Sequence, residues 1–378
     1  MLAKRRKFGK GKEVSLFTLG TMRALKSKSN LLEVIQEAFH SGINHIETAK
    51  AYGDAEKYLG KALKITNETN QIPEGGWVIT TKILPKGSLD ELKDQIMNSL
   101  DNLGIDKLNN LAIHGINTSK HLHWSLEGEG SKFIEWAFRE NIIEQIGFSS
   151  HGNYELIEEA IESKKFEFCS LHLHLLEQSK IPLAIKALNY GLGVMAISPA
   201  HKGGGLYAPS EILKNVCSPY QPLEMAYRFL IAKGITTLTI GASKPSEFKI
   251  VKKLCNSDKY LDNREKEAIE KINSQLKSSL KNTLCEQCGY CIPCPNQIPI
   301  PEILRLRNLA LGLGQKEFAK ERYNLIGKAG HWWETSKAND CNNCGDCLPR
   351  CPNNLSIPNL LKETHTLLND SPKRRLWE

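Results

Sequence analysis

Eight of the eleven cysteines lie in two groups within the last hundred residues, at spacings typical of metal ligands. In the first group each cysteine is separated from the next by two residues: Cys285, Cys288, Cys291 and Cys294. The second group has the pattern C-x2-C-x2-C-x3-C-P: Cys341, Cys344, Cys347 and Cys351. Thiolates at these spacings can hold iron–sulfur clusters or zinc.

The position of the fourth cysteine in each group predicts how two [4Fe-4S] clusters would share these ligands. Three closely spaced thiolates reach three corners of one cubane, and in two-cluster ferredoxins the fourth cysteine ligates the other cluster. We therefore expect one cluster on Cys285, Cys288, Cys291 and Cys351, and a second on Cys341, Cys344, Cys347 and Cys294. The first group departs from the ferredoxin pattern, because only Ile292 and Pro293 precede its last cysteine. A pair of structural zinc sites is the alternative, although two triplets each followed by Cys-Pro favour clusters.

The remaining composition indicates a globular protein in a reducing compartment. Cys169, Cys217 and Cys255 are isolated and are expected to be packing residues. The other eight cysteines have metal-ligand spacing rather than a disulfide pattern, which favours a reducing compartment, so we expect a cytoplasmic location. No apolar run approaches the roughly 18 residues of a membrane span. The net charge of +8 includes six Lys or Arg between Lys4 and Lys12, which could attract an acidic protein or be a solvated end. No nucleic-acid-binding motif accompanies them.

Eight β-type runs alternate with amphipathic helical segments from Val14 to about Ser279, a pattern typical of a parallel α/β fold. The runs lie near Ser15 to Leu19, Ile43 to Thr48, Trp77 to Thr81, Asn110 to His114, Gln145 to Ser149, Phe166 to Leu171, Gly193 to Ser198 and Thr236 to Ile240. Eight strand–helix units predict a (β/α)8 TIM barrel, with its chemistry at the carboxyl ends of the strands.

Helical segments are expected at Leu31 to His40 after a cap at Ser29, Leu89 to Leu103 after Ser88, Pro222 to Ala232, and Lys266 to Lys281. Composition then shifts to Cys, Pro and Asn, so we predict a barrel over residues 1–281 and a small iron–sulfur domain over 282–378. Helical spacing from Ile303 to Ile326 predicts that this second, ferredoxin-like domain is mainly helical.

Several segments in order resemble the aldo-keto reductase family. They are L-G-T-M at Leu19 to Met22, G-I-N-H-I-E-T-A-K-A-Y-G at Gly42 to Gly53, T-K at Thr81 and Lys82, A-I-H at Ala112 to His114, I-G-F-S-S-H at Ile146 to His151 and I-G-A-S-K-P at Ile240 to Pro245. The resemblance spans Arg5 to about Leu280, and a subgroup of the family carries a C-terminal ferredoxin-like extension. It implies a barrel oxidoreductase.

The resemblance implies a catalytic set of Tyr52, Lys82, His114 and Glu47. Tyr52 would be the general acid that protonates a carbonyl oxygen, although a phenol with a pKa near 10 is a reluctant donor at neutral pH. Lys82 would favour the phenolate electrostatically, and His114 would orient the carbonyl oxygen. Glu47 would hold Lys82, in place of the family's usual Asp.

The resemblance also implies a binding site for NADPH or NADH. The residues of this site are where the sequence departs most from the family. Ser170 replaces the usual glutamine, Ile197 replaces an aromatic residue, and Ala242 and Phe248 stand where NADPH-preferring members have basic residues. The expected nucleotide contacts are Gly20, Thr21, Met22, Ser149, Ser150, Ser170, Ser198, Lys202, Gly203, Gly241, Ser243 and Lys244.

Four histidines and three tryptophans are weaker candidates for metal binding, substrate contact or packing beside a cluster. His172 and His174 alternate along one expected strand, but they lack a third metal ligand at useful spacing. Contacts to substrate are possible in the loop that carries His121, His123 and Trp124. Trp332 and Trp333 could pack beside a cluster, and ordinary packing is the alternative for all of these aromatic residues.

Two functions fit these features. The first is an oxidoreductase that reduces a carbonyl or related small molecule, using NADPH or NADH, electrons from the clusters, or a ferredoxin-like donor protein. Clusters carry single electrons, whereas nicotinamide transfers a hydride, which carries two. No flavin motif is evident that would divide the two electrons of the hydride into single steps. The alternative is an electron-transfer or binding-platform protein whose barrel has lost hydride chemistry, which Glu47, Ser170 and Ile197 favour.

Overall fold

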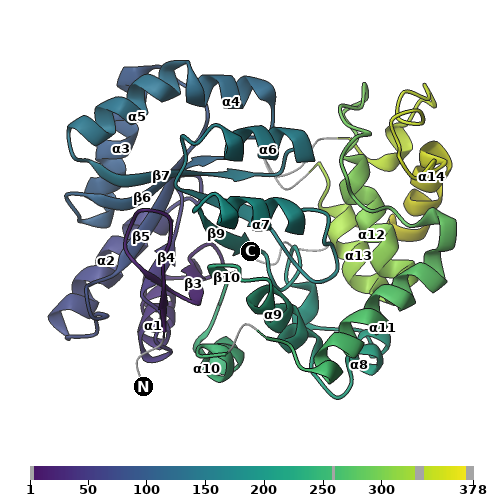
Figure 1. Cartoon of the computed structure of the whole chain (residues 1–378), viewed down its shortest axis with the longest axis horizontal. Coiled ribbons are helices and arrows are strands. Elements are labelled where there is room, and N and C mark those ends of the chain that lie inside the picture. The colour runs from purple at the N-terminus through teal and green to yellow at the C-terminus, as the bar shows by residue number, and fades with distance from the viewer. Residues whose placement is uncertain (1–3, 258–259, 328–335, 372–378) are drawn as a thin grey trace.

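Eight parallel strands close into a barrel in the computed structural model, which describes residues 4–257, 260–327 and 336–371 (Figure 1). The strand order β10-β3-β4-β5-β6-β7-β8-β9 follows the chain and closes between its ends, which confirms the predicted TIM-type barrel. The barrel strands are β3 (Phe17–Gly20), β4 (His45–Glu47), β5 (Val78–Ile83), β6 (Leu108–His114), β7 (Ile143–Ser150), β8 (Phe168–His172), β9 (Gly193–Ile197) and β10 (Thr237–Ile240). Each strand overlaps one of the eight predicted runs.

Helices surround the barrel because each one buries an apolar stripe against the strands. They are α1 (Lys28–His40), α2 (Ala55–Glu68), α3 (Leu89–Leu103), α4 (Ser119–Leu126), α5 (Glu129–Arg139), α6 (Tyr154–Glu162), α7 (Ile181–Asn189), α8 (Glu211–Cys217), α9 (Pro222–Ala232), α10 (Lys249–Leu254) and α11 (Asn263–Leu280). Ser88 caps α3 as predicted, and its side chain and that of Glu91 form a capping box. The predicted cap Ser29 is wrong, because the hydroxyl of Ser27 accepts the Asn30 N–H and α1 begins earlier.

The basic N-terminal segment closes the amino end of the barrel. A hairpin of β1 (Arg5–Arg6) and β2 (Val14–Ser15) places Phe8 against Phe168, with ring centroids 4.9 Å apart. The Arg5 and Arg6 guanidinium groups donate to the carbonyl oxygens of Gly42 and Ile235, which precede strands β4 and β10. The segment therefore lies at the amino ends of the barrel strands, and its attraction of an acidic protein stays a prediction.

The C-terminal domain is built from α12 (Ile300–Gly312), α13 (Lys316–Asn324) and α14 (Ile357–Leu368). The single-turn helix η3 (Lys281–Thr283) follows the barrel, and η5 (Ala338–Asp340) precedes the second cysteine group. A further single turn, η1 (Gly205–Tyr207), lies in the loop after β9 of the barrel. Both cysteine groups lie in loops without helix or strand, apart from short turns. The helix α11 that leads out of the barrel ends at Leu280, beside the predicted domain boundary.

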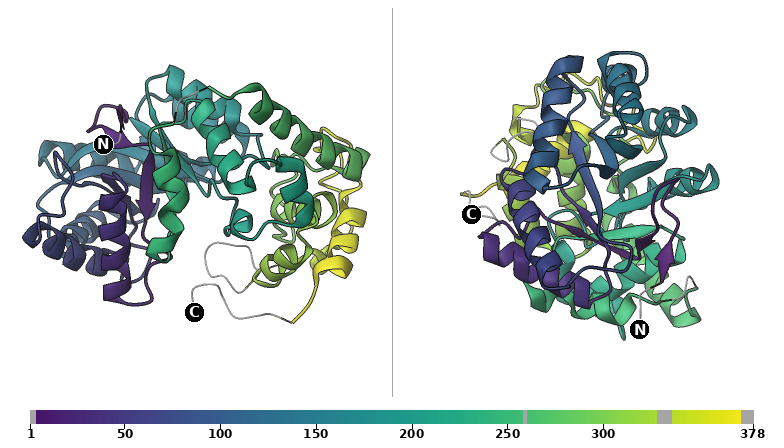
Figure 2. Two further views of the ribbon diagram at one scale, coloured as in Figure 1. Left: turned by 90° about the horizontal axis from the view of Figure 1, so that it is seen from below. Right: turned by 90° about the vertical axis from the view of Figure 1, so that its left-hand side faces the viewer.

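This domain lies at the carboxyl ends of β7, β8 and β9, where Figures 1 and 2 show it as a lobe beside the barrel, away from the N terminus. The Tyr290 hydroxyl donates to Glu155, just after β7. Gln315 donates to the carbonyl oxygen of Gly205 at 3.0 Å, in the segment after β9. The C-terminal domain thus shares the barrel end at which TIM-barrel chemistry takes place.

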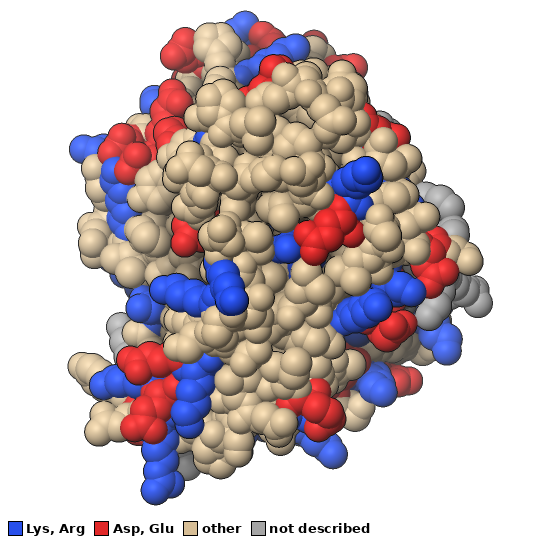
Figure 3. Space-filling model, turned by 90° about the vertical axis from the view of Figure 1, so that its right-hand side faces the viewer, with Lys and Arg blue, Asp and Glu red and all other residues tan. Residues whose placement is uncertain are grey.

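The outer face of the C-terminal domain carries positive and negative side chains in small groups around a broad uncharged area (Figure 3). The net positive charge of the chain is therefore not concentrated on this face. Among the described residues, no helix combines the length and apolar character needed to cross a membrane.

Candidate active site and cysteine groups

Lys82 is the centre of a buried polar group at the carboxyl ends of β4 and β5. Its Nζ donates to the Thr48 carbonyl oxygen at 2.9 Å and to the Tyr52 hydroxyl at 3.1 Å, and it forms an ion pair with Glu47. The Tyr52 ring meets the His114 ring edge to face, with centroids 5.8 Å apart. The four residues predicted to be catalytic thus converge in one place, from β4, its following loop, β5 and β6.

Burial controls the protonation of this group. It raises the pKa of Tyr52 and lowers the pKa of Lys82 well below its usual value, because charged forms lose hydration in the protein interior. Burial therefore opposes the acidity that we expected Lys82 to give Tyr52. Tyr52 stays a neutral phenol that can donate a hydrogen bond, and it would release its proton only to an oxygen on which negative charge develops.

Glycine at position 20 makes room for the longer carboxylate of Glu47. A side chain at Gly20 would place its Cβ 2.9 Å from Thr239 and 3.5 Å from the Glu47 Oε2 atom. The Thr21 hydroxyl donates to the Thr48 hydroxyl at 3.0 Å, and the Thr21 N–H donates to the Glu47 carbonyl oxygen at 3.1 Å. Gly20 and Thr21, predicted as nucleotide contacts, thus support Glu47.

Three of the expected nucleotide contacts, Ser149, Ser150 and Ser170, are serines on the neighbouring strands β7 and β8, but they are not equally available for a new hydrogen bond. The Ser149 hydroxyl accepts the Gly115 N–H at 3.0 Å, and the Ser150 hydroxyl donates to the Ile116 carbonyl oxygen at 2.5 Å. Ser170 is fully buried, and its hydroxyl has no hydrogen-bond partner among the described residues. Ser150 is committed to holding the loop after β6, whereas Ser170 can accept a new contact.

The loop after β9, which carries the expected nucleotide contacts Lys202 and Gly203, contacts the C-terminal domain. Lys202 forms an ion pair with Glu302 at 3.2 Å. A Cβ at Gly203 would lie 2.9 Å from the side chain of Arg322, and one at Gly205 would lie 3.1 Å from Phe318. These glycines therefore allow α13 to approach the barrel.

The other expected nucleotide contacts surround β3 and β10. The Ser243 hydroxyl donates to Glu247 at 2.8 Å, and the Gly241 carbonyl oxygen accepts from Arg23 at 2.6 Å. Ser198 has a positive φ of 55°, a backbone conformation that residues other than glycine rarely adopt. Met22 and Lys244 are exposed.

The loop after β6 uses its polar groups internally. The His121 ring contacts the Gly115 carbonyl oxygen at 3.0 Å, and the Trp124 Nε1 donates to that of Gly87 at 3.4 Å. His123 pairs with Glu127 on the surface. Trp332 and Trp333 lie outside the described residues.

The two cysteine groups lie close together, and the division of their ligands between two clusters stays a prediction. The pKa of Cys285 is raised to about 12, first by burial and then by the nearby side chains of Cys288 and Cys351. Burial also raises the pKa of Cys347, to which Cys341, Cys344 and Cys294 then contribute. The same four side chains of the second set line one cavity. The fourth cysteine of each group therefore faces the triplet of the other group.

Two kinds of metal site could use these cysteines, iron–sulfur clusters and zinc, and they place different demands on the arrangement of the thiolates. Among the residues that the structure describes, no three His, Cys, Asp or Glu side chains lie close enough together to ligate a single metal ion. Four thiolates on one zinc ion would each lie about 2.3 Å from it, whereas each thiolate of a [4Fe-4S] cluster binds a different iron. The donor set of eight cysteines fits two clusters.

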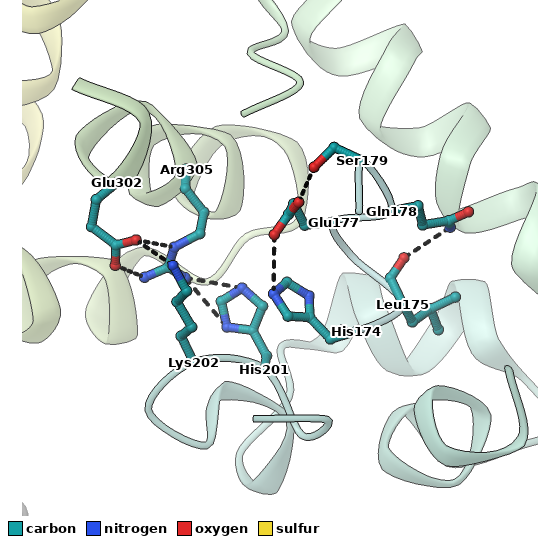
Figure 4. Close-up of polar contacts among 9 residues, drawn as sticks. All are labelled: His174, Leu175, Glu177, Gln178, Ser179, His201, Lys202, Glu302 and Arg305. Carbon is teal, nitrogen blue, oxygen red and sulfur yellow. Dashed lines mark hydrogen bonds and ion pairs between the residues drawn. The ribbon is translucent and has the colours of Figure 1, made fainter. Parts of the chain in front are cut away.

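A polar cluster that the sequence did not reveal joins the two domains (Figure 4). Arg305 of α12 contacts the His201 ring at 3.0 Å and pairs with Glu302, and the His174 ring lies 3.7 Å from a Glu177 oxygen. Glu177 is close enough to Cys285 to raise the pKa of that thiol. These residues come from distant segments, so no local pattern could have identified them.

The profile of the aldo/keto reductase family matches residues 16–211, which are more than half of the 378-residue chain. This chain belongs to the aldo/keto reductase family. The profile of a 4Fe-4S dicluster domain matches residues 284–356, so the C-terminal domain is an iron–sulfur domain.

Two curated relatives each match about half of this chain. An aldo-keto reductase of Strobilurus tenacellus is 25% identical over 208 residues, which are 52% of this chain and 59% of the relative. An uncharacterised oxidoreductase of Caenorhabditis elegans is 27% identical over 208 residues, 52% of this chain and 60% of that protein. The chain thus spans about three fifths of the length of these relatives.

Solved structures share the fold. An aldo-keto reductase from Bacillus halodurans, in its holo form, matches with a TM-score of 0.61 and 20% identity over 71% of this chain and 96% of that one. One from Bombyx mori, in complex with NADP, matches with a TM-score of 0.58 and 20% identity over 71% of this chain and 92% of that one.

Proposed function

We propose that this protein is an oxidoreductase that reduces a carbonyl group at Tyr52 and exchanges electrons through two [4Fe-4S] clusters. Membership of the aldo/keto reductase family and the convergence of Glu47, Tyr52, Lys82 and His114 support the reaction. A small molecule with a carbonyl or a related unsaturated group is the proposed substrate.

Each residue of this set has a distinct role. Tyr52 holds a proton on its hydroxyl oxygen and donates it to the carbonyl oxygen, while His114 orients that oxygen from the edge of the Tyr52 ring. Lys82 fixes the Tyr52 hydroxyl at 3.1 Å, and Glu47 and Thr48 fix Lys82. Bound NADPH or NADH would supply the hydride, and the clusters would supply or accept single electrons.

The position of the iron–sulfur domain is the observation that carries the proposal. The domain lies at the carboxyl ends of β7, β8 and β9, and the catalytic residues lie at the carboxyl ends of β4, β5 and β6 of the same barrel. Placement of both centres at one end of the barrel favours a shared electron path over two independent activities.

A second candidate, in which the barrel has lost hydride chemistry and binds a molecule for the clusters to act on, is favoured by the contacts of the loop after β9. Lys202 and Gly203 contact Glu302 and Arg322 of the iron–sulfur domain. A nucleotide that used this loop would compete with those contacts.

The experiment that separates the two candidates uses anaerobically purified protein. Iron and sulfide content is measured, and EPR spectra are recorded after addition of dithionite, NADPH or NADH in separate samples. About eight iron atoms per chain, with cluster signals after nucleotide addition, are expected if both sites share one path. Signals with dithionite alone, together with no nucleotide binding at millimolar concentration, would favour the second candidate.

A further inference from the structure

A chain of hydrogen-bonded polar side chains runs across six neighbouring strands inside the barrel. In the order β10, β3, β4, β5, β6 and β7, each strand contributes one residue: Thr237, Thr18, His45, Thr80, Asn110 and Gln145. All six side chains are fully buried. Bulky apolar residues usually fill the interior of a TIM barrel, so a buried polar layer favours a role beyond packing. We call these six residues the polar chain.

The N-terminal segment fixes the direction of the hydrogen bonds at one end of the polar chain. The Gln145 Oε1 atom accepts the Gly11 N–H at 3.0 Å, and the Gln145 Nε2 atom donates to the Phe8 carbonyl oxygen at 3.2 Å. A backbone N–H only donates and a carbonyl oxygen only accepts, so the Gln145 amide has a single orientation. Glycine at position 11 allows this approach, because a Cβ there would lie 2.5 Å from the Gln145 Nε2 atom.

This direction is passed from Gln145 to His45. The Gln145 Nε2 atom donates to the Asn110 Oδ1 atom at 2.6 Å, so the Asn110 Nδ2 atom is left to donate to the Thr80 hydroxyl at 2.9 Å. The Thr80 hydroxyl lies 2.7 Å from the His45 Nε2 atom, and the Asn110 Nδ2 atom lies 3.4 Å from it. Because two donors face Nε2, this nitrogen carries no proton.

His45 is therefore the neutral tautomer with its proton on Nδ1. The Nδ1 atom lies 2.8 Å from the Thr18 hydroxyl, to which it donates, and the Thr18 hydroxyl lies 2.7 Å from that of Thr237. The pKa of His45 is lowered to about 3, first by burial and then by the charge of Lys82, which agrees with a neutral ring.

The polar chain lies one layer below the catalytic residues. Side chains two residues apart on a strand share a face, so Glu47 lies above His45 on β4. Lys82 lies above Thr80 on β5 in the same way. Two residues of a strand span about 7 Å. A second proton on His45 would place another positive charge about that far from Lys82 in a dry interior, where like charges repel strongly.

We propose that His45 is a positioning residue of the active site, held by the polar chain as the neutral Nδ1–H tautomer so that Lys82 keeps its place between Glu47 and Tyr52. The effect on catalysis rests on the proposed carbonyl reduction, whereas the tautomer depends on the polar chain alone. The N-terminal segment, at the amino ends of the strands, thereby supports the active site at their carboxyl ends.

The first test reads the protonation of His45 by ¹⁵N NMR of the full-length protein with its clusters, labelled at histidine. The His45 signals are identified by their loss in His45→Gln. A protonated Nδ1 and an unprotonated Nε2 are expected in the wild type. Asn110→Asp replaces the donor that faces Nε2 with a carboxylate that only accepts, so a proton is expected on Nε2. The matched control Asn98→Asp, exposed on α3, is expected to leave both signals unchanged.

Three results of this test would overturn the proposal. They are a protonated Nε2 in the wild type, an unprotonated Nε2 in Asn110→Asp, and the same change in Asn98→Asp as in Asn110→Asp. If Asn110→Asp fails to fold, the wild-type spectrum still decides the tautomer.

The second test measures the placement of Lys82 without turnover. The ¹³Cζ NMR signal of Tyr52, identified by its loss in Tyr52→Phe, reports the contact of its hydroxyl with Lys82. His45→Leu removes both hydrogen bonds of the ring and is expected to shift this signal. His45→Gln keeps one acceptor and one donor and is expected to shift it less. Equal shifts in the two variants, or no shift in either, would contradict the positioning role.

Steady-state kinetics with butyraldehyde and glyceraldehyde extend this test to catalysis. His45→Leu is expected to lower kcat by about tenfold and to change KM by less than about twofold, because His45 lies a layer below the substrate. His45→Gln should recover most of kcat. A rise in KM with unchanged kcat would contradict the proposal. If the wild type reduces neither aldehyde, the proposed carbonyl reduction loses support, while the His45 and Tyr52 signals still test the inference.

Discussion

The catalytic residues of the barrel and the cysteines of the iron–sulfur domain are held in different ways. Tyr52, Lys82 and Glu47 lie on or just after strands, and hydrogen bonds within the chain fix them. The cysteines lie in loops between α11 and α12 and before α14, and the backbone that carries them is irregular.

The catalytic residues and the cysteines therefore differ in whether the folded chain alone holds them in place. The barrel strands close their own hydrogen-bonded sheet, so the catalytic residues on them are in place once the chain has folded. The cysteine loops have little regular structure, and metal binding contributes to folding wherever ligand residues are not otherwise held. We therefore expect the barrel to fold without cofactors and the cysteine loops to depend on the clusters.

Loss of a cluster should have the largest effect and should be confined to one region. Cys351→Ser removes a ligand from the set that contains Cys285, so iron content should fall by about half and the cysteine loops should lose protection from hydrogen exchange. Strands β3 to β10 should keep their protection. Hydrogen exchange with mass spectrometry and iron analysis measure both effects.

The matched control for this prediction is Cys255→Ser, a cysteine outside both groups, which should leave iron content unchanged. Loss of protection across the barrel strands in Cys351→Ser would show that the two regions do not fold separately.

Replacement of Tyr52 should affect chemistry alone. Tyr52→Phe removes the proton donor and should lower kcat for carbonyl reduction by about a thousandfold, within the range of general acid catalysis. Iron content and the EPR spectrum should be unchanged, because Tyr52 lies among barrel residues, in contact with Lys82 and His114. Steady-state kinetics of the variant test this, and turnover within tenfold of the wild type would exclude Tyr52 as the acid.

The contact between the regions should be sensitive to acid. Burial favours the protonated form of Glu302, but Arg305 and Lys202 outweigh this and hold its pKa well below the usual 4.5. Because the folded pKa is the lower one, Glu302 stabilises the protein above about pH 4.5, and this contribution is lost as the pH falls towards the folded pKa. Glu302→Gln should therefore destabilise the iron–sulfur domain by about 3 kcal/mol at pH 7, and by less in acid.

Glu363→Gln is the matched control, because Glu363 also pairs with an arginine, Arg307, but its side chain is 48% exposed. It should cost at most about 1 kcal/mol. Anaerobic urea denaturation, followed by cluster absorbance at several pH values, compares the two variants. Equal losses for both would contradict the assignment of Glu302 as a buried contact between the domains.

The smallest expected effect concerns the length of one side chain in the barrel. Glu47→Asp should lower kcat about tenfold, because the shorter carboxylate moves away from Lys82 in a site built around glutamate. Glu47→Gln, which keeps the length and removes the charge, should lower it further. Kinetics of both variants measure this, and full activity in Glu47→Gln would show that the carboxylate charge is not needed.

Much of the fold followed from local patterns in the chain. Period-two and buried apolar runs located all eight strands, and Ser88 and Pro222 marked the starts of α3 and α9 correctly. The start of α1 was missed because Ser27 and Ser29 are both acceptable caps. The catalytic set and the cysteine sets could be proposed because their spacing is fixed by one strand, one loop or one motif.

The contacts of the loop after β9 could not be predicted in this way. Lys202 and Gly203 resemble nucleotide contacts in sequence, yet in the structure they contact Glu302 and Arg322, about a hundred residues away. The sequence by itself therefore determined the barrel, the iron–sulfur domain and the residue types for their chemistry, because periodicity and ligand spacing are local. Only the tertiary structure decided which polar groups meet between the domains, since electrostatic pairing depends on distances across the fold.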